Sequence, residues 1–429
     1  MRKKTISRPL ALLLGLCLIA GLCAFSADRS RSSSVGILRA QAADLLENIT
    51  PAENAETLET DERFAAAVQR LGVLLLQKEQ ENGSGKNLLI SPLSVMTALT
   101  MTMNGAKGTT LSQMEQVVGG GLSRRELNAY LTGWYRSLDE NPSVTLRFAN
   151  AIWFLDAPDF LVKDSFLQTN ADHFNAAIRK TPVFDSAALQ EINQWADQHT
   201  DHMIPKLLEE LDPYTEMVLL NALVFDAGWD DPYNPKTNVR PGIFTLENGE
   251  KRDVSMMYSE EALYLEDENC RGIIKYYAGR NYRFAALLPE EGMSMSEFIR
   301  SLTAEKLSKL LAGASQTSVV TGLPSFSYDF DTDLRNAFIG LGMTDAFGRA
   351  DFTDISEGGG ISISQIIHRT HIDVDTDGTK AAAVTAVIMT RAMAPPSGGK
   401  KEVVFDRPFV YLILDQNNVP VFIGAVTDP

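Results

Sequence analysis

Cysteine is scarce in this chain. The three cysteines are Cys17, Cys23 and Cys270. The first two lie in an apolar run close to the amino terminus that has the pattern of a secretory signal peptide, so the mature chain would retain only Cys270. Because one cysteine cannot form an internal disulfide, the sequence excludes a disulfide-stabilised fold for the mature protein.

Clusters of basic residues are also absent after residue 26. The sequence has 39 Lys and Arg residues against 55 Asp and Glu residues, a formal net charge of −16. Loss of residues 1–26 would remove four basic residues and no acidic one, which changes −16 to −20. Such a chain is not expected to bind nucleic acid. Without a Lys/Arg cluster, we expect no heparin-like polyanion cofactor either.

Motifs for catalysis, cofactors and metals are missing as well. There is no phosphate-binding loop, dinucleotide fingerprint or G-x-S-x-G elbow. Ser397 and Lys400 have S-x-x-K spacing, but two glycines lie between them, and such a loop supplies neither a rigid helix start nor an oxyanion hole. His199 and His202 could ligate a metal from one helix face, but no second ligand pair accompanies them. We predict no enzyme, cofactor or metal site, and a solvated polar face at the two histidines.

The amino terminus has the features of an export signal. Four basic residues within the first eight positions precede an apolar run over residues 10–25. This pattern predicts a signal peptide over residues 1–26. An uncleaved anchor is the alternative, although the run is short for a bilayer span. Residues 27–60 are polar and weakly patterned, so we expect a disordered lead-in or tether. The protein is then secreted or extracellular, or retained at the cell surface by this tether.

Residues 61–429 contain no linker or repeat and are expected to form one large domain. Apolar residues make up 45% and charged residues 22% of the chain, as in globular proteins. Strand-like runs at 145–154 and 282–288 occur among helical stretches such as 62–78, without regular alternation. This pattern indicates an α+β fold.

A short segment near the carboxyl end is the most informative part of the sequence. Alternate residues from position 379 to 385 are small, so a strand formed here would have one narrow face able to enter between two existing strands. Gly378 precedes this strand and would act as a hinge. An amphipathic helix is the alternative, because alanine favours helices. The small face consists of Thr379, Ala381, Ala383 and Thr385, and the opposite face of Lys380, Ala382 and Val384.

The residues that follow favour the strand. Residues 393–401 are rich in proline, glycine and serine and predict an exposed loop. Two apolar runs at 403–415 and 419–426 predict a buried terminal hairpin. This part of the chain resembles the end of a serpin, because it has a hinge, a small-residue strand, an exposed loop and a terminal hairpin in this order. Serpins are a family of serine-protease inhibitors.

Further segments extend this resemblance over about residues 61–429. They follow one another in the family's order, and His368 precedes Gly378 by the interval that the family uses for a buried histidine. The matching segments are 87–94, 104–110, 221–225 with Gly228 and Trp229, 342–347, 350–352 and 405–409.

The resemblance implies a serpin fold over residues 61–429, with a main mixed β-sheet, further sheets, surrounding helices and an exposed reactive-centre loop at about 376–400. It places Ser91, Ser94, Asn221 and His368 in a polar cluster beneath the main sheet, called the shutter, and Trp229 at the breach, where the loop enters the sheet. A satisfied polar core without a gating role is the alternative for the shutter. The implied hinge comprises Gly378, Thr379, Lys380, Ala381, Ala382, Ala383, Val384, Thr385 and Ala386.

The implied activity is irreversible inhibition of extracellular serine proteases. The partner is a target serine protease held as a covalent acyl complex, and the inhibitor is expected to be a monomer. The reactive bond is expected between Ala392 and Met393, which suits elastase-like or subtilisin-like proteases. The alternative bond, between Arg391 and Ala392, suits trypsin-like proteases. Two other functions remain open: a non-inhibitory serpin acting as a binding or chaperone-like protein, and a hydrolase that uses a serine near His368.

Overall fold

The computed structural model describes residues 42–83, 85–138, 144–158, 160–174, 176–212, 214–358, 360–379 and 401–429. All described residues belong to one compact unit, residues 40–429. Among these residues, no helix combines the length and apolar character needed to cross a bilayer.

Sheet A is a mixed sheet of seven strands within the described ranges. β5 runs antiparallel to β3 and parallel to β12, and β3 runs parallel to β4. In spatial order the strands are β1 (Ala43–Asp44), β4 (Ala177–Thr181), β3 (Val144–Leu155), β5 (Met217–Gly228), β13 (Gly378–Thr379), β12 (Gln365–Val374) and β11 (Phe326–Asp333).

Sheet B contains nine strands of the described chain and includes the carboxyl-terminal hairpin. β6 (Val239–Thr245) pairs with β7 at its side. The other strands, in spatial order, are β14 (Lys401–Val404), β10 (Ser315–Pro324), β7 (Lys251–Glu266), β8 (Cys270–Tyr276), β9 (Tyr282–Pro289), β15 (Phe409–Asp415), β16 (Pro420–Val426) and β2 (Leu88–Ile90).

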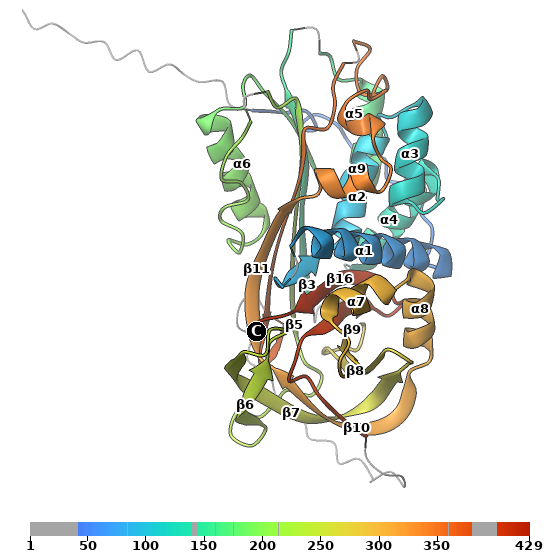
Figure 1. Ribbon diagram of the computed structural model, residues 1–429. Coiled ribbons are helices and arrows are strands. Elements are labelled where there is room, and N and C mark those ends of the chain that lie inside the picture. The colour runs from blue at the N-terminus through green and yellow to red at the C-terminus, as the bar shows by residue number, and fades with distance from the viewer. Residues whose placement is uncertain are drawn as a thin grey trace, which may run out of the picture. The chain divides into compact units, whose positions relative to one another are not determined.

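Helices cover both faces of sheet A (Figure 1). α6 (Ser186–His199) packs on one face, over a separate apolar cluster that includes Trp153. α7 (Met295–Ser301) and α8 (Ala304–Ala312) lie beside sheet B (Figure 1). The opposite side of sheet A carries α1 (Glu62–Asn82), α2 (Pro92–Met103), α3 (Gly108–Val118), α4 (Arg124–Leu138), α5 (Asp164–His173) and α9 (Arg335–Gly340), and the 3₁₀ turn Asp345–Phe347 follows α9.

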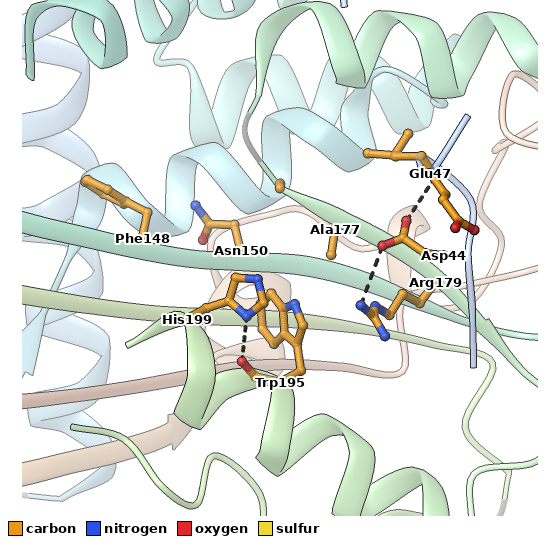
Figure 2. A pocket seen from close by; sticks show the side chains of 10 residues that line it. Asp44, Glu47, Phe148, Asn150, Ala177, Arg179, Trp195 and His199 are labelled. Carbon is orange, nitrogen blue, oxygen red and sulfur yellow. Dashed lines mark hydrogen bonds and ion pairs between the residues drawn. The ribbon is translucent and has the colours of Figure 1, made fainter. Parts of the chain in front are cut away.

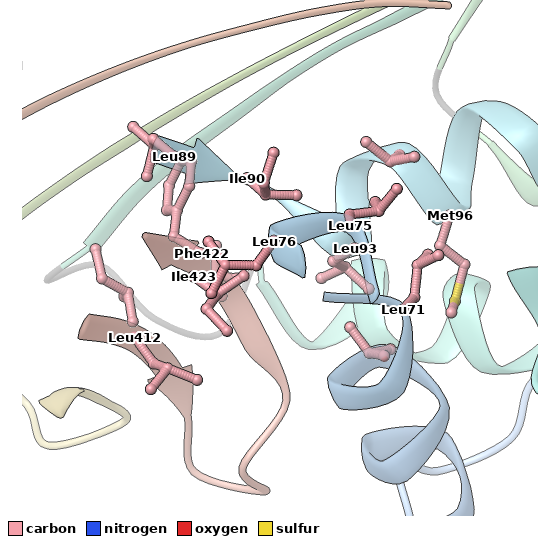
Figure 3. Packing of buried hydrophobic residues seen from close by; sticks show 14 of the residues in the cluster. Leu71, Leu75, Leu76, Leu89, Ile90, Leu93, Met96, Leu412, Phe422 and Ile423 are labelled. Atoms are coloured by element: carbon pink, nitrogen blue, oxygen red, sulfur yellow. The ribbon is translucent and has the colours of Figure 1, made fainter. Parts of the chain in front are cut away.

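The main core joins α1, α2 and the end of sheet B. Figure 3 shows Leu71 and Leu75 of α1 close to Leu93 of α2, with Phe422 and Ile423 of β16 beside them. The amino-terminal end of α2 is stabilised because the Ser91 side chain caps it and Pro92 occupies the first helical position. Every residue of α2 is buried, so α2 is a central helix of the domain.

Most predicted elements are present close to their predicted bounds. The 62–78 helix is α1, the 145–154 strand is β3 and the 282–288 strand is β9. The terminal hairpin is formed by β15 and β16, but its first predicted residues belong instead to β14, which pairs in parallel with β10. Pro408 lies between β14 and β15, where a residue without a backbone N–H interrupts strand pairing.

The segment 42–60 differs from the predicted disordered lead-in over residues 27–60. β1 pairs with β4 at the edge of sheet A, and the N–H of Leu58 donates to the carbonyl of Ala129 in α4 at 3.0 Å. Leu45, Leu46 and Ile49 pack against the main core. Residues that are weakly patterned in sequence are thus ordered by long-range contacts with the domain.

Candidate functional site

At one end of sheet A, the first residues of the predicted hinge lie between strands β5 and β12. β12 and β5 pair directly only over Gln365–Thr370 and Val218–Leu223. Beyond these residues the two-residue strand β13 lies between them. Thr379 pairs with Ala227 of β5 and with Val374 of β12, and both pairings are antiparallel.

Gly378 is required by close backbone approach. A Cβ atom at this position would lie 2.2 Å from the carbonyl oxygen of Ala227 and 2.8 Å from the Cα atom of Gly228. Such distances do not occur for real side chains. The sequence predicted a hinge at Gly378; in the structure, glycine at this position allows β13 to fit against β5.

Hydrogen bonds to Trp229, the predicted breach residue, hold the turn before β13 in place. The Asp375 carboxylate accepts from the N–H groups of Asp377 and Gly378 at 2.8 and 3.1 Å. The indole Nε1 of Trp229 donates to the carbonyl of Asp375 at 2.9 Å, and the Trp229 N–H donates to the carbonyl of Asp377 at 2.8 Å. Trp229, predicted at the breach, thus holds the turn that leads into the hinge.

An aromatic stack lies beneath this turn. The rings of Trp229 and Tyr277 stack with centroids 4.5 Å apart. Burial raises the pKa of the Tyr277 phenol, which therefore stays protonated, and its hydroxyl forms a hydrogen bond with Thr379 Oγ1 at 2.5 Å. Lys275 lies over the Tyr233 ring at 4.5 Å and forms a buried ion pair with Glu261 at 2.8 Å. A buried charge of this kind is tolerated only when it is paired.

The four predicted shutter residues form one buried network. Asn221 of β5 donates from Nδ2 to Ser94 Oγ at 2.5 Å, and its Oδ1 lies 2.6 Å from His368 Nδ1 on β12. The backbone N–H of Ser91 donates to His368 Nε2 at 3.1 Å. Because Nε2 accepts a hydrogen bond, the neutral ring carries its proton on Nδ1 and donates to Asn221.

This geometry does not suit a serine–histidine nucleophile pair. Ser91 Oγ accepts from the Ser94 N–H as a helix cap, at 3.3 Å, and His368 contacts the Ser91 backbone rather than its hydroxyl. Burial lowers the pKa of His368 to about 3, so its ring is a weak base. All three side chains are fully buried, which denies a substrate access.

Asn150 of β3 completes the network and was not predicted. Its Oδ1 accepts from Asn221 Nδ2 at 2.7 Å and from Ser94 Oγ at 3.4 Å. The usable signal was a single polar residue within the apolar run from Phe148 to Leu155, where a buried polar side chain must find a partner. The network therefore spans three adjacent elements, namely β3, β5 and β12, above the start of α2.

The other predicted residues have simple environments or lie outside the described residues. The His199 ring lies tilted against the Trp195 ring, with centroids 4.8 Å apart, whereas His202 is exposed and bonds to Asp197 at 2.7 Å. Within the described ranges, no group of three or more His, Cys, Asp or Glu side chains could hold a metal ion. The residues outside the description are the hinge positions Lys380, Ala381, Ala382, Ala383, Val384, Thr385 and Ala386, the reactive-bond candidates Arg391, Ala392 and Met393, and the Ser397–Lys400 motif.

Known proteins resemble this chain over most of its length. Serpin B6 of Pongo abelii is 30% identical over 378 residues, which cover 83% of this chain and 97% of the relative. The leukocyte elastase inhibitor of Bos taurus is 28% identical and matches over 86% of this chain and all of the relative.

Solved structures agree with the sequence relatives. The thermophilic serpin tengpin in its native state has 40% sequence identity and a TM-score of 0.84, covering 91% of this chain and 100% of tengpin. Tengpin in its latent state gives 39% identity and a TM-score of 0.74, covering 87% and 99% of the two chains. The fold is thus the α+β serpin fold, and the described arrangement is more similar to the native form.

A family model described as "Serpin (serine protease inhibitor)" matches residues 66–429, which include both the shutter and the breach. Taken with the sheet, the buried network and the relatives, this match shows that the chain belongs to the serpin family.

Proposed function

We propose that this chain is an inhibitory serpin that traps serine proteases irreversibly. The observation that supports this proposal is the position of β13. Gly378 and Thr379 lie between β5 and β12, at the point where these two strands cease to pair with each other. The following residues have a small face, so strand entry can continue without burial of bulky side chains.

The proposed reaction begins with the protease acting on the loop as a substrate. The protease serine oxygen attacks the scissile carbonyl, and the amide C–N bond breaks as a proton passes to the leaving amine. An ester then joins the protease serine to the new carboxyl end of the loop. Loop insertion would carry the protease away and distort its oxyanion hole, and without those donors the ester is hydrolysed slowly.

The register of β13 predicts which residues the inserted strand would meet. Thr379 is paired with Ala227 and Val374, and an antiparallel strand continued from it would bring Thr385 between Asn221 and His368. Those two residues now bond to each other. Insertion would therefore separate the shutter pair, and the Thr385 hydroxyl would offer both side chains a new partner.

The small face would also meet the main core. Ala227, Phe225 and Leu223 of β5 belong to that core, and paired residues in a sheet share a face. Continued pairing would point Thr379, Ala381 and Ala383 toward the core and Lys380 toward α6.

The proposed target proteases depend on the scissile bond. Cleavage between Ala392 and Met393 would select elastase-like or subtilisin-like enzymes. Cleavage between Arg391 and Ala392 would select trypsin-like enzymes, because an arginine in the primary pocket requires a carboxylate partner. We further propose that the protein acts as a secreted or surface-retained monomer.

Incubation with an elastase-like protease and, separately, with a trypsin-like protease tests the proposal. We expect a band at the summed mass on a denaturing gel, and mass spectrometry of the released peptide would identify the bond. Clean cleavage of the loop without such a band would support the non-inhibitory binding or chaperone-like alternative instead.

Thr379→Arg sharpens this test. Thr379 is already buried between β5 and β12 beside Tyr277, so an arginine is expected to leave this position in the intact protein. Insertion would then have to bury the arginine there, at a cost of about 1–3 kcal/mol or more, which slows insertion relative to ester hydrolysis. We expect cleaved inhibitor and free protease in place of the complex. Thr379→Ser keeps the hydroxyl and is the control, with a wild-type yield expected. A wild-type yield from Thr379→Arg would contradict strand insertion.

A further inference from the structure

Exposed apolar side chains gather at one end of sheet A. The large apolar side chains that are exposed in the described ranges are Leu58, Leu161, Val183, Tyr214 and Ile243. Of these, Leu161 is 76%, Val183 50% and Tyr214 91% exposed, and these three lie at the same end of the sheet. Single exposed apolar residues are common on protein surfaces, whereas a group of them marks an interaction surface.

Val183 and Tyr214 lie next to strand ends that meet at Leu155. β3 ends at Leu155, which pairs with the last residue of β4, two residues before Val183. The N–H of Leu155 donates to the carbonyl of Glu216 at 2.9 Å, and Glu216 is two residues after Tyr214. Both exposed side chains therefore belong to the end of the sheet where β3 and β4 stop and β5 starts.

Leu161 lies at the same end. The carbonyl of its neighbour Phe160 accepts from Lys180 Nζ at 2.7 Å, one residue before the end of β4. Phe160 is 5% exposed and packs against Phe154, with ring centroids 5.2 Å apart. Because Phe160 points into the core, Leu161 is directed to solvent. Figure 1 shows α5 and α6, which begin shortly after Leu161 and Val183, at the end of the domain opposite β6.

The backbone beside these side chains is held by hydrogen bonds and strand pairing. Asp212 Oδ1 accepts from the N–H of Tyr214 at 2.8 Å. β4, which ends before Val183, lies between β3 and β1, and Asp44 Oδ2 of β1 lies 3.5 Å from Nη2 of Arg179 on β4 (Figure 2). The exposed apolar side chains therefore occupy defined positions in the fold.

The proposed loop insertion would bring a trapped protease to this end of the sheet. Thr379 pairs with β5 in antiparallel register, and ten residues further this register brings Met389 opposite Met217, the first residue of β5. Ala392 would then extend about 10 Å beyond the strand end, at the rise of an extended chain. The ester to the protease would thus lie just beyond the sheet, as Tyr214 does. The alternative bond is one residue nearer to the sheet.

The protease delivered to this end would have a disturbed active site. Its oxyanion hole must lose its donors if the ester is to persist. Displaced active-site segments uncover apolar side chains that the folded protease buries, as partly folded proteins do. An apolar surface on the inhibitor would remove these side chains from water.

We propose that Leu161, Val183 and Tyr214 form a docking surface for the trapped protease and stabilise its distorted form. This proposal rests on the inhibitory function proposed above. Hydrolysis of the ester requires the protease to regain its oxyanion hole and therefore to leave this surface. Contacts that favour the distorted form by a given factor slow hydrolysis by the same factor. The first encounter with the loop is unaffected, because β13 pairs at the opposite end of β5.

The lifetime of the covalent complex tests this surface. Complex is prepared with pancreatic elastase and, separately, with trypsin, and the return of protease activity is followed with a small substrate. Tyr214→Ser should form the complex at the wild-type rate and yield. It should release active protease about tenfold faster, as expected when an interface loses a well-packed tyrosine. Leu161→Ser should change the release rate in the same direction.

Ile243→Ser is the matched control. Ile243 is an exposed apolar residue as well, at 46%, but it lies on β6 at the opposite end of the domain (Figure 1). Its release rate should stay within about twofold of wild type. Equal release rates for wild type and Tyr214→Ser would overturn the docking surface and leave the inhibitory function intact. No covalent complex between the wild-type chain and either protease would overturn both.

Thiol labelling observes the contact directly. Val183→Cys should react with a small alkylating reagent in the intact inhibitor and in cleaved inhibitor without protease, and more slowly in the complex. The other thiol of the predicted mature chain is that of Cys270, which is buried. Equal labelling of the cleaved inhibitor and the complex would overturn the proposal.

Sedimentation of the intact chain examines a second possible occupant of this surface. We expect a monomer for wild type and for Tyr214→Ser. A wild-type dimer that Tyr214→Ser dissociates would assign the surface to a second copy of the chain and overturn the proposal.

Discussion

Gly378 lies where two backbones approach too closely for any side chain. Gly378→Ala would place a methyl group 2.2 Å from the Ala227 carbonyl, so β13 would have to leave its position between β5 and β12. We expect overpacking to cost about 1–3 kcal/mol and faster proteolysis of the hinge. Gly228→Ala is the matched control, because its added Cβ would meet Asp377 O at 3.5 Å, an ordinary contact. Thermal unfolding and limited proteolysis of both variants check this prediction, and indistinguishable results would contradict it.

His368 predicts a pH dependence of stability. An unfolded histidine titrates near pH 6.5, whereas burial lowers the pKa of His368 to about 3 in the folded protein. Below pH 6.5 the unfolded state binds more protons, so the free energy of unfolding should fall as pH falls, with a slope that approaches about 1.4 kcal/mol per pH unit near pH 5. Denaturant unfolding should show a loss of about 2 kcal/mol from pH 7 to 5 in wild type and a smaller loss in His368→Gln.

Direct observation of the ring provides an independent check. The NMR signal of the His368 ring should not titrate between pH 7 and 5, because burial lowers the pKa of this ring to about 3. A His368 signal that titrates near pH 6.5 would contradict the buried neutral ring, even if His368→Gln fails to fold.

Individual site residues were predictable where an unusual residue type stood in an apolar context. Ser91, Asn221 and His368 stand out in this way, and the resemblance to serpins located them. Lys275 and Glu261 were missed because neither residue type signals burial, and only the fold brings them together beneath Tyr233. The reactive bond lies outside the described residues, so its position stays a prediction.

At the scale of elements, residues 42–60 are expected to stabilise the domain. β1 extends sheet A, the Ala52 N–H donates to Asp172 at 2.7 Å, and Leu45, Leu46 and Ile49 pack against the core. The exposed pair between Glu56 and Arg125 should add little.

Truncation tests this contribution. A chain that starts at residue 61 should lose about 2–4 kcal/mol of stability relative to one that starts at residue 42, because partly buried leucine and isoleucine side chains are lost. Thermal melting of the two chains measures the difference. Equal melting temperatures would show that this segment contributes nothing.

Elements with strong local patterns were predictable, and those that depend on distant partners were not. α1 has a capping aspartate and a long apolar stripe, and β15 and β16 are continuous apolar runs, so local sequence suffices. β1 has two residues, both exposed, and exists only because β4 lies beside it. The resemblance to serpins could not predict the pairing of β1 with β4, because β1 precedes the segments on which the resemblance is based.

At the scale of the whole molecule, cleavage of the loop should increase stability. Inserted residues would gain ladder hydrogen bonds to both β5 and β12, each worth about 0.5–1.5 kcal/mol net. We expect the cleaved protein to melt at least about 10 °C above the intact protein. Calorimetry before and after cleavage by a protease that is not trapped measures this difference. Equal melting temperatures would remove the energetic basis of the proposed inhibition.

The direct contact between β5 and β12 is parallel, whereas β13 runs antiparallel to both. Completing β13 would therefore exchange one slanted ladder for two of the more stable kind along the middle of sheet A. The inserted strand would not leave the sheet again at ordinary temperatures. Each inhibitor molecule could therefore trap only one protease molecule, and the rate of inhibitor synthesis would set the concentration of active inhibitor.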